Sequence, residues 1–102
     1  MYKDLENQFH EGMLNIYYRA RDEAHYRASY YLRMVRNRGG VDAAKRLINR
    51  KPTQGLNKLH QLGRFDLTVE ALIWDNTQFH LLFTKEELRI VKNRLIEYGY
   101  IK

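Results

Sequence analysis

The chain has 102 residues, enough for one domain with a modest core, and its 44% hydrophobic and 29% charged residues are typical of a folded protein rather than a disordered one. It contains no cysteine, which excludes disulfides, a thiolate nucleophile and cysteine-ligated zinc. No apolar run is long enough to span a membrane, and the opening residues MYKDLENQF lack the apolar run of a signal peptide. We expect a cytoplasmic protein with a single domain over residues 1–102.

The net charge of +6 is concentrated in the middle of the chain. Residues 19–64 contain twelve Lys or Arg and three acids, a local charge of +9, whereas the rest of the chain carries −3. Such asymmetry is typical of proteins that contact a polyanion, although an Arg-rich solvated helical surface gives the same pattern.

The first third of the chain has the apolar period of a helix. From Leu5 to Val35, apolar residues recur at steps of three and four, which places them on one helical face. We expect one long helix over residues 4–38, or two helices in line with a kink near residues 20–26. Gly39 and Gly40 end this segment.

Shorter helices are expected in the remaining two thirds. Pro52 and Gly63 are stop signals, Asp66 is the expected N-cap of the following helix, and Thr84 with Glu87 forms a capping box. No strand pattern or internal repeat is evident, so we predict an all-α fold: a compact bundle of five or six helices with a long N-terminal helix. The shorter helices are expected over residues 41–50, 53–62, 67–74 and 84–98, with 75–83 as a short helix or an irregular crossing.

Six motifs occur in order: YYLRMV, GGVDAAKRLI, GLNKL, GRFDLTVEALI, LFTKEEL and RLIEYGY. Over about residues 16–100 they resemble a small domain of unknown function that recurs in bacterial and mobile-element proteins, alone or appended to larger chains. Members of that family tend to carry an aromatic residue at the position of Leu56 and a tryptophan at that of His60. The resemblance implies an all-helical fold and a prokaryotic or phage setting, and it implies no activity.

The basic residues around the two glycines are the main candidate binding site. If the helices on either side fold back on each other, their cations approach one patch, and arginine's planar fork matches phosphate oxygens. The alternative is that basic residues in a last helical turn complement the helix dipole, at about 0.3–1 kcal/mol each. Seven basic residues exceed what capping requires: Arg33, Arg36, Arg38, Lys45, Arg46, Arg50 and Lys51.

Tyrosines interleave with the arginines in this region. Tyr17 and Tyr31 belong to the apolar stripe, whereas Tyr18, Tyr26 and Tyr30 fall off it. We expect Tyr26 and Tyr30 to contribute to the binding surface, because exposed tyrosines stack on single-stranded bases or anchor protein interfaces. The alternative is that they pack against the C-terminal segment YGYI.

Two pairs of segments have the layout of a base-reading helix-turn-helix. The first pair is residues 30–37 and 41–50, and the second is residues 41–50 and 54–62. The second pair would present amides and a lysine that are able to read base edges, although most solvent faces look similar. These outward residues are Gln54, Asn57, Lys58 and Gln61.

The sequence argues against catalysis. The four histidines are scattered, and neither an HExxH motif nor a phosphate-binding glycine loop is present. Arg64 is expected to pair with Asp66 or Glu70 and to fix a turn, rather than to act in chemistry. We therefore expect no enzyme activity, no cofactor and no metal site.

These observations favour a non-catalytic basic module that contacts nucleic acid, DNA or RNA, or a nucleic-acid-processing protein. The alternative is a small phage or mobile-element protein that inhibits a bacterial defence nuclease through protein–protein contact, as anti-CRISPR proteins do. The basic charge argues against simple mimicry of DNA, which needs an acidic surface.

Overall fold

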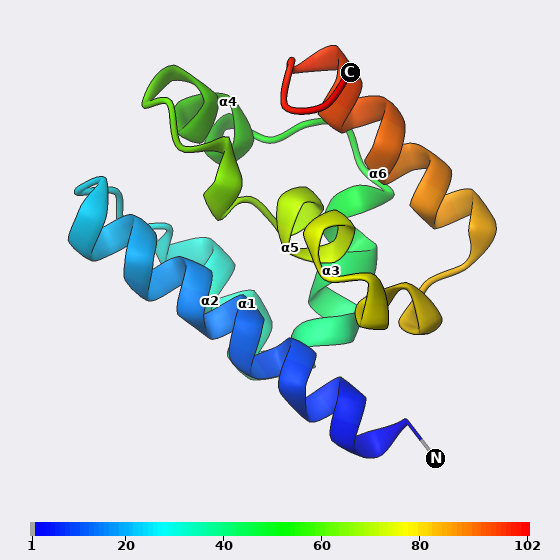
Figure 1. Ribbon diagram of the computed structural model, residues 1–102. Helices are drawn as coiled ribbons and strands as arrows, with labels where there is room; N and C mark the ends of the chain where they lie inside the picture. The colour runs from blue at the N-terminus through cyan, green and yellow to red at the C-terminus, as the bar shows by residue number, and fades with distance from the viewer. Residues whose placement is uncertain (1) are drawn as a thin grey trace.

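The computed structural model describes residues 2–102, which fold into α-helices and short 3₁₀ segments without a strand among them (Figure 1). This confirms the predicted all-α bundle with a long N-terminal helix. No helix in the described part of the chain is both long and apolar enough to cross a membrane. The helices are α1 (Lys3–Glu23), α2 (Ser29–Arg38), α3 (Gly40–Ile48), α4 (Gln54–Gln61), α5 (Val69–Asp75) and α6 (Lys85–Glu97), and the 3₁₀ segments are η1 (Phe65–Leu67) and η2 (Thr77–Leu82).

The core lies where α1, α3, α5 and α6 meet, and α2 covers one side of α1 (Figure 1). The inner face predicted for α1 is buried, and Phe9 on that face is fully enclosed. Its ring makes edge-to-face contacts with Phe79 of η2 and with Phe83, at centroid distances of 5.1 and 5.4 Å. Such contacts join the N-terminal helix to the segment between α5 and α6.

The prediction of one long helix, or of two helices in line, is wrong. The α1 helix ends at Glu23, where the carbonyl oxygen of Ala20 accepts hydrogen bonds from the amides of both Ala24 and Tyr26, at 3.1 and 3.0 Å. His25 adopts a φ of 53°, a left-handed conformation that closes many helices. This turn redirects the chain, so α2 does not continue the axis of α1.

A tertiary hydrogen bond then holds α2 against α1. The hydroxyl of Tyr31 donates to the main-chain oxygen of Met13 at 2.8 Å. Burial raises the pKa of the Tyr31 hydroxyl, and the negative charge of Glu70 raises it further. The Tyr31 hydroxyl therefore stays protonated and remains a donor at neutral pH.

The closest approach between α1 and α3 is at Gly40. A Cβ atom at this position would lie 2.6 Å from the Cα atom of His10, so only glycine fits. The amide of Gly40 donates to Nδ1 of His10 at 2.9 Å, which also caps the start of α3. Gly39, with a φ of 85°, forms the turn between α2 and α3, as the sequence predicts.

Three caps determine where the later helices start. Thr53 accepts a hydrogen bond from the amide of Leu56, and the predicted capping box of Thr84 and Glu87 is confirmed. The prediction that Asp66 caps the next helix is wrong, because Thr68 caps α5 instead. Asp66 lies in η1, where burial of the flanking Phe65 and Leu67 shifts the start of α5 by two residues. The crossing predicted over residues 75–83 contains η2.

We predict that Gly40→Ala destabilises the protein by about 1–3 kcal/mol, because the added methyl group pushes α1 and α3 apart. Helix propensity alone predicts the opposite sign, since alanine is the better helix former. Urea unfolding measures the change, with the exposed Asn37→Ala in α2 as a control that should stay within about 0.5 kcal/mol of the parent. A Gly40→Ala protein as stable as the parent would contradict the close approach.

A second prediction concerns acid stability. Hydrogen bonds from Arg19 and Arg64 lower the pKa of Glu23 from 4.5 to about 2. A carboxylate whose pKa is lowered on folding stabilises the protein above its unfolded pKa, and this contribution is lost as the pH falls from 4.5 to about 2. The Glu23→Gln variant should therefore lose less stability over this interval than the parent protein does. Thermal unfolding of both proteins at a series of pH values measures the difference.

The matched control is Glu97→Gln, which removes an exposed α6 carboxylate that has no basic group within 4.0 Å among residues 2–102. Its acid profile should follow that of the parent. If Glu23→Gln and Glu97→Gln lose stability equally between pH 4.5 and 2, the two arginines do not stabilise the Glu23 carboxylate.

Candidate binding cavity and basic face

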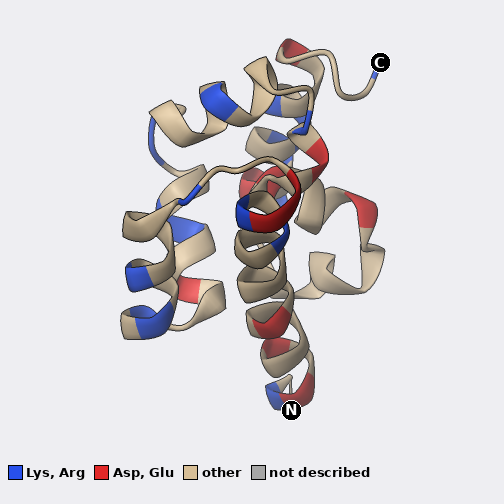
Figure 2. Ribbon diagram, turned by 90° about the vertical axis from the view of Figure 1, so that its left-hand side faces the viewer, with Lys and Arg blue, Asp and Glu red and all other residues tan. Residues whose placement is uncertain are grey.

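The predicted basic residues of α2 lie at the surface. The sides of α2 that face α1 and α3 bury Met34 and Val35, which leaves Arg33, Arg36 and Arg38 exposed. In Figure 2 the blue residues of α2 and α3 gather on one side of the molecule, whereas most of the charged residues in the N-terminal half of α1 are red. The helical period therefore predicts the exposure of these three arginines from the sequence.

Ion pairs occupy three of the seven predicted cations. Lys45 contacts Glu87 of α6 at 2.7 Å and lies over the ring of Phe83, so it faces α6 rather than α2. Arg38 and Arg46 share the carboxylate of Asp42, at 3.7 and 3.4 Å. The structure therefore does not bring all seven together as one patch of free cations.

The other four predicted cations are exposed, as is Arg27 in the connection between α1 and α2. None of these five has a carboxylate within 4.0 Å in the described part of the chain. Arg50, at the end of α3, lines the same cavity as Tyr30 at the start of α2, so the open end of the α2–α3 hairpin is basic. We call these residues the basic face: Arg27, Arg33, Arg36, Arg50 and Lys51.

The two predicted tyrosines have different environments. Tyr30 is 64% exposed, and its side chain projects from the first turn of α2. Tyr26 is half-buried and lies against α4, where a Cβ atom at Gly55 would come within 2.9 Å of its hydroxyl. Tyr30 is therefore available to a partner on the surface, whereas Tyr26 forms part of the wall of a cavity.

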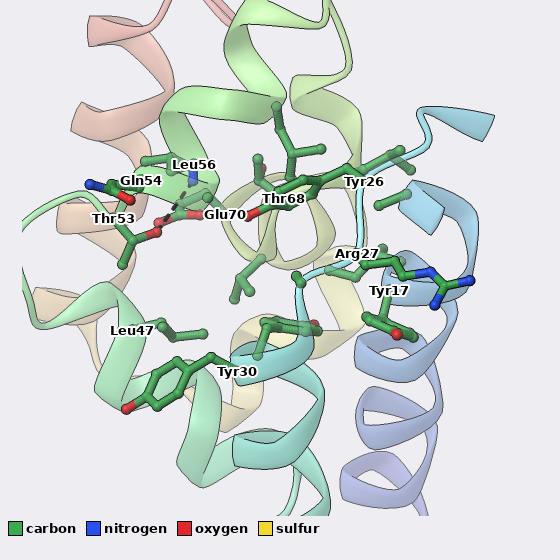
Figure 3. A pocket seen from close by; sticks show the side chains of 18 of the residues that line it. Tyr17, Tyr26, Arg27, Tyr30, Leu47, Thr53, Gln54, Leu56, Thr68 and Glu70 are labelled. Atoms are coloured by element: carbon green, nitrogen blue, oxygen red, sulfur yellow. Dashed lines mark hydrogen bonds between the residues drawn. The ribbon is translucent and has the colours of Figure 1, made fainter. Parts of the chain in front are cut away.

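A cavity of about 540 Å³ lies between the C-terminal end of α1, the start of α2, the end of α3, and α4 and α5. This volume is within the usual range of small-molecule and cofactor sites. Figure 3 shows Tyr26, Thr53 and Leu56 along one border and Leu47 and Tyr30 along the opposite one. Nothing in the sequence predicts this cavity, because its lining comes from six separate segments, the sixth being Arg94 of α6.

A buried ion pair forms part of the cavity wall. Glu70 of α5 and Arg94 of α6 have side chains only 5% and 10% exposed, and Arg94 Nη1 lies 2.8 Å from Glu70 Oε2. Arg94 also donates through Nη2 to the main-chain oxygen of Arg50 at 2.6 Å and through Nη1 to that of Leu47 at 3.5 Å. The pair therefore connects α5, α6 and the end of α3.

Sequence reasoning missed this pair. Of the two partners predicted for Arg64, Asp66 is confirmed at 3.1 Å, and Glu70 is wrong. The available signal was the position of Glu70 inside the apolar run VEALI, because a charge on a buried face needs a partner. Nothing local identifies that partner as Arg94, which lies 24 residues further along the chain.

The structure also bears on the two helix-turn-helix arrangements. In the first, α3 is the recognition helix, but it packs against α1, α2, α5 and α6, which leaves little of it to enter a groove. In the second, α4 exposes the four predicted polar residues, although the Asn57 side chain already accepts a hydrogen bond from the hydroxyl of Tyr98 at 2.7 Å. Of the two, only α4 has a free outer face.

We predict that Arg94→Met destabilises the protein by about 3–5 kcal/mol, because it leaves the Glu70 carboxylate buried without a counter-ion. The double variant Glu70→Gln/Arg94→Met, which buries no charge at these positions, should recover part of this loss. A double-mutant cycle on urea unfolding measures the coupling. Additive effects of the two substitutions would show that the ion pair does not stabilise the fold.

Comparison with known proteins gives no assignment: no family model, curated protein or solved structure matches the chain. The resemblance to a bacterial and mobile-element domain therefore stays a prediction. The cavity and the basic face are the features from which a function can be argued.

Proposed function

We propose that the protein is a non-catalytic module that binds nucleic acid through its basic face. One observation carries this proposal: the basic face has five exposed cations without a carboxylate partner among residues 2–102, and two of them, Arg27 and Arg50, line the same cavity as Tyr30, which is 64% exposed. A cation without an ion pair in the protein can bind phosphate directly, because no ion pair has to break first. An exposed aromatic side chain among cations adds a surface on which a base can stack.

Arginine supplies four of the five cations on the basic face, and its planar fork matches two phosphate oxygens. The α2 helix has ten residues and is about 15 Å long, so Arg33 and Arg36 on its outer side can contact neighbouring phosphates of one strand. The net charge of +6 adds long-range attraction to a polyanion.

The alternative partner is a protein, as in a phage-encoded inhibitor of a defence nuclease. Tyr30 and the arginines of the basic face suit such an interface too, because Tyr and Arg are enriched at binding hot spots. Salt distinguishes the two partners. Phosphate contacts weaken steeply with ionic strength, whereas an interface anchored by aromatic residues weakens far less.

We predict that the protein binds labelled oligonucleotides and that Arg33→Gln/Arg36→Gln weakens this binding about tenfold or more at about 50 mM salt. Each phosphate contact contributes about 0.7–0.9 to the slope of log K against log salt. The double variant should therefore lower that slope by about 1.5 between about 50 and about 300 mM salt. Fluorescence anisotropy measures both quantities.

The matched control is Lys85→Gln/Lys92→Gln, which removes the same charge from exposed positions on α6. Its affinity should stay within about twofold of the parent if the basic face makes the contacts. Equal losses in the two double variants would show attraction by net charge alone. A parent protein that binds no nucleic acid at low salt would overturn the proposal and leave the protein partner as the function to test.

A further inference from the structure

We propose that the 540 Å³ cavity receives an unstacked base that carries an amino group, presented by a single strand of nucleic acid. This inference rests on the proposed function and specifies its substrate class. Three features of the cavity carry it: aromatic walls, a carboxylate with one free oxygen, and arginines among the lining residues that have no ion pair within residues 2–102.

The walls suit the flat face of a base. Tyr17, Tyr26, Tyr30 and Tyr31 all line the cavity. The aliphatic side chain of Leu47 lines it beside Tyr30 (Figure 3). Proteins that hold single strands stack bases on aromatic side chains of this kind. A base inside a duplex cannot enter, because it is stacked and paired, so the cavity favours a single strand.

The acceptor is the free oxygen of Glu70. Arg94 donates to Oε2 of this carboxylate, and no hydrogen bond within residues 2–102 ends on Oε1. Glu70 lines the cavity although its side chain is only 5% exposed, so Oε1 is the acceptor that it can offer to a ligand there. A carboxylate oxygen accepts from the amino group of cytosine, whereas thymine presents a carbonyl oxygen at the same ring position and is repelled.

Two cations of the basic face, Arg27 and Arg50, also line the cavity. Figure 3 shows the guanidinium of Arg27 extending outward, away from the space between the tyrosines. Arg50 is held in place because its main-chain oxygen accepts a hydrogen bond from Arg94. Cations at the rim with an acceptor inside match a nucleotide, whose phosphate is anionic and whose base carries the donor. They do not match a cationic or a wholly apolar ligand.

The test compares three single strands of about ten nucleotides with equal phosphate number: oligo-dC, oligo-dT and a fully abasic strand. Because the phosphate contacts are equal, they cancel in the comparison. Differences in affinity between the three strands therefore measure the contribution of the base. We expect oligo-dC to bind at least about fivefold more tightly than oligo-dT, and the abasic strand to bind most weakly.

Two variants identify the residues responsible. Tyr30→Ala removes an exposed ring and should weaken binding of oligo-dC about five- to 150-fold, whereas Tyr2→Ala, at an exposed tyrosine near the start of α1, should leave it unchanged. Glu70→Gln can keep an oxygen for Arg94 and turn its amide donor to the cavity, which should reverse the preference in favour of oligo-dT. Circular dichroism checks that each variant is folded.

The outcomes separate this inference from the proposed function. Equal affinities for all three strands, with binding still lost at high salt and in Arg33→Gln/Arg36→Gln, would overturn the base cavity and keep the basic face. Absence of binding to every strand would overturn both. If Glu70→Gln does not fold, the comparison of the three strands and the Tyr30→Ala variant still decide the question.

Discussion

The ion pair between Glu70 and Arg94 is the constraint on which the rest of the structure depends. Taking two charges out of water is costly, so such a pair persists only when the geometry is good and the remaining donors are satisfied. Here Arg94 reaches one carboxylate oxygen and two main-chain oxygens at the end of α3. One side chain of α6 thereby fixes α5 and the C-terminal end of α3 relative to each other.

The same pair shapes the candidate site. It places an acceptor in the cavity wall and holds Arg50, whose side chain belongs to the basic face, at the edge of the cavity. The interior pair and the surface charge are therefore parts of one arrangement. A binding surface supported from a rigid core loses little conformational entropy when a partner binds.

Helices could be predicted from the sequence where one face carries a clear apolar period. The residues at which one helix ends and the next begins could not. The apolar stripe keeps its phase across residues 24–28, and no residue there forbids a helix. The chain turns after α1 because His25 adopts a left-handed conformation and the hydroxyl of Tyr31 donates to the main-chain oxygen of Met13. Both features favour the packing of α2 against α1 over the continuation of α1. The choice of Thr68 over Asp66 as a cap likewise depends on how η1 is buried.

The candidate site was predictable to the same extent. A helix exposes the side opposite its apolar face, so the arginines of α2 could be assigned to the surface from their spacing. Lys45 could not be excluded from the predicted basic patch on the basis of sequence, because its partner Glu87 lies 42 residues away. The cavity depends wholly on tertiary packing, and the only local trace of it is a glutamate in an apolar run.

The central claim is that the basic face and the cavity bind one strand together, and two-dimensional NMR of the ¹⁵N-labelled protein titrated with oligo-dC tests it most directly. We predict that the amide signals that shift come from α2, the end of α3 and the start of α4, around Tyr30, Arg50 and Thr53. Signals from the N-terminal half of α1 should stay in place. Shifts confined to α6 or to the first turns of α1, or no shifts at all, would contradict the account.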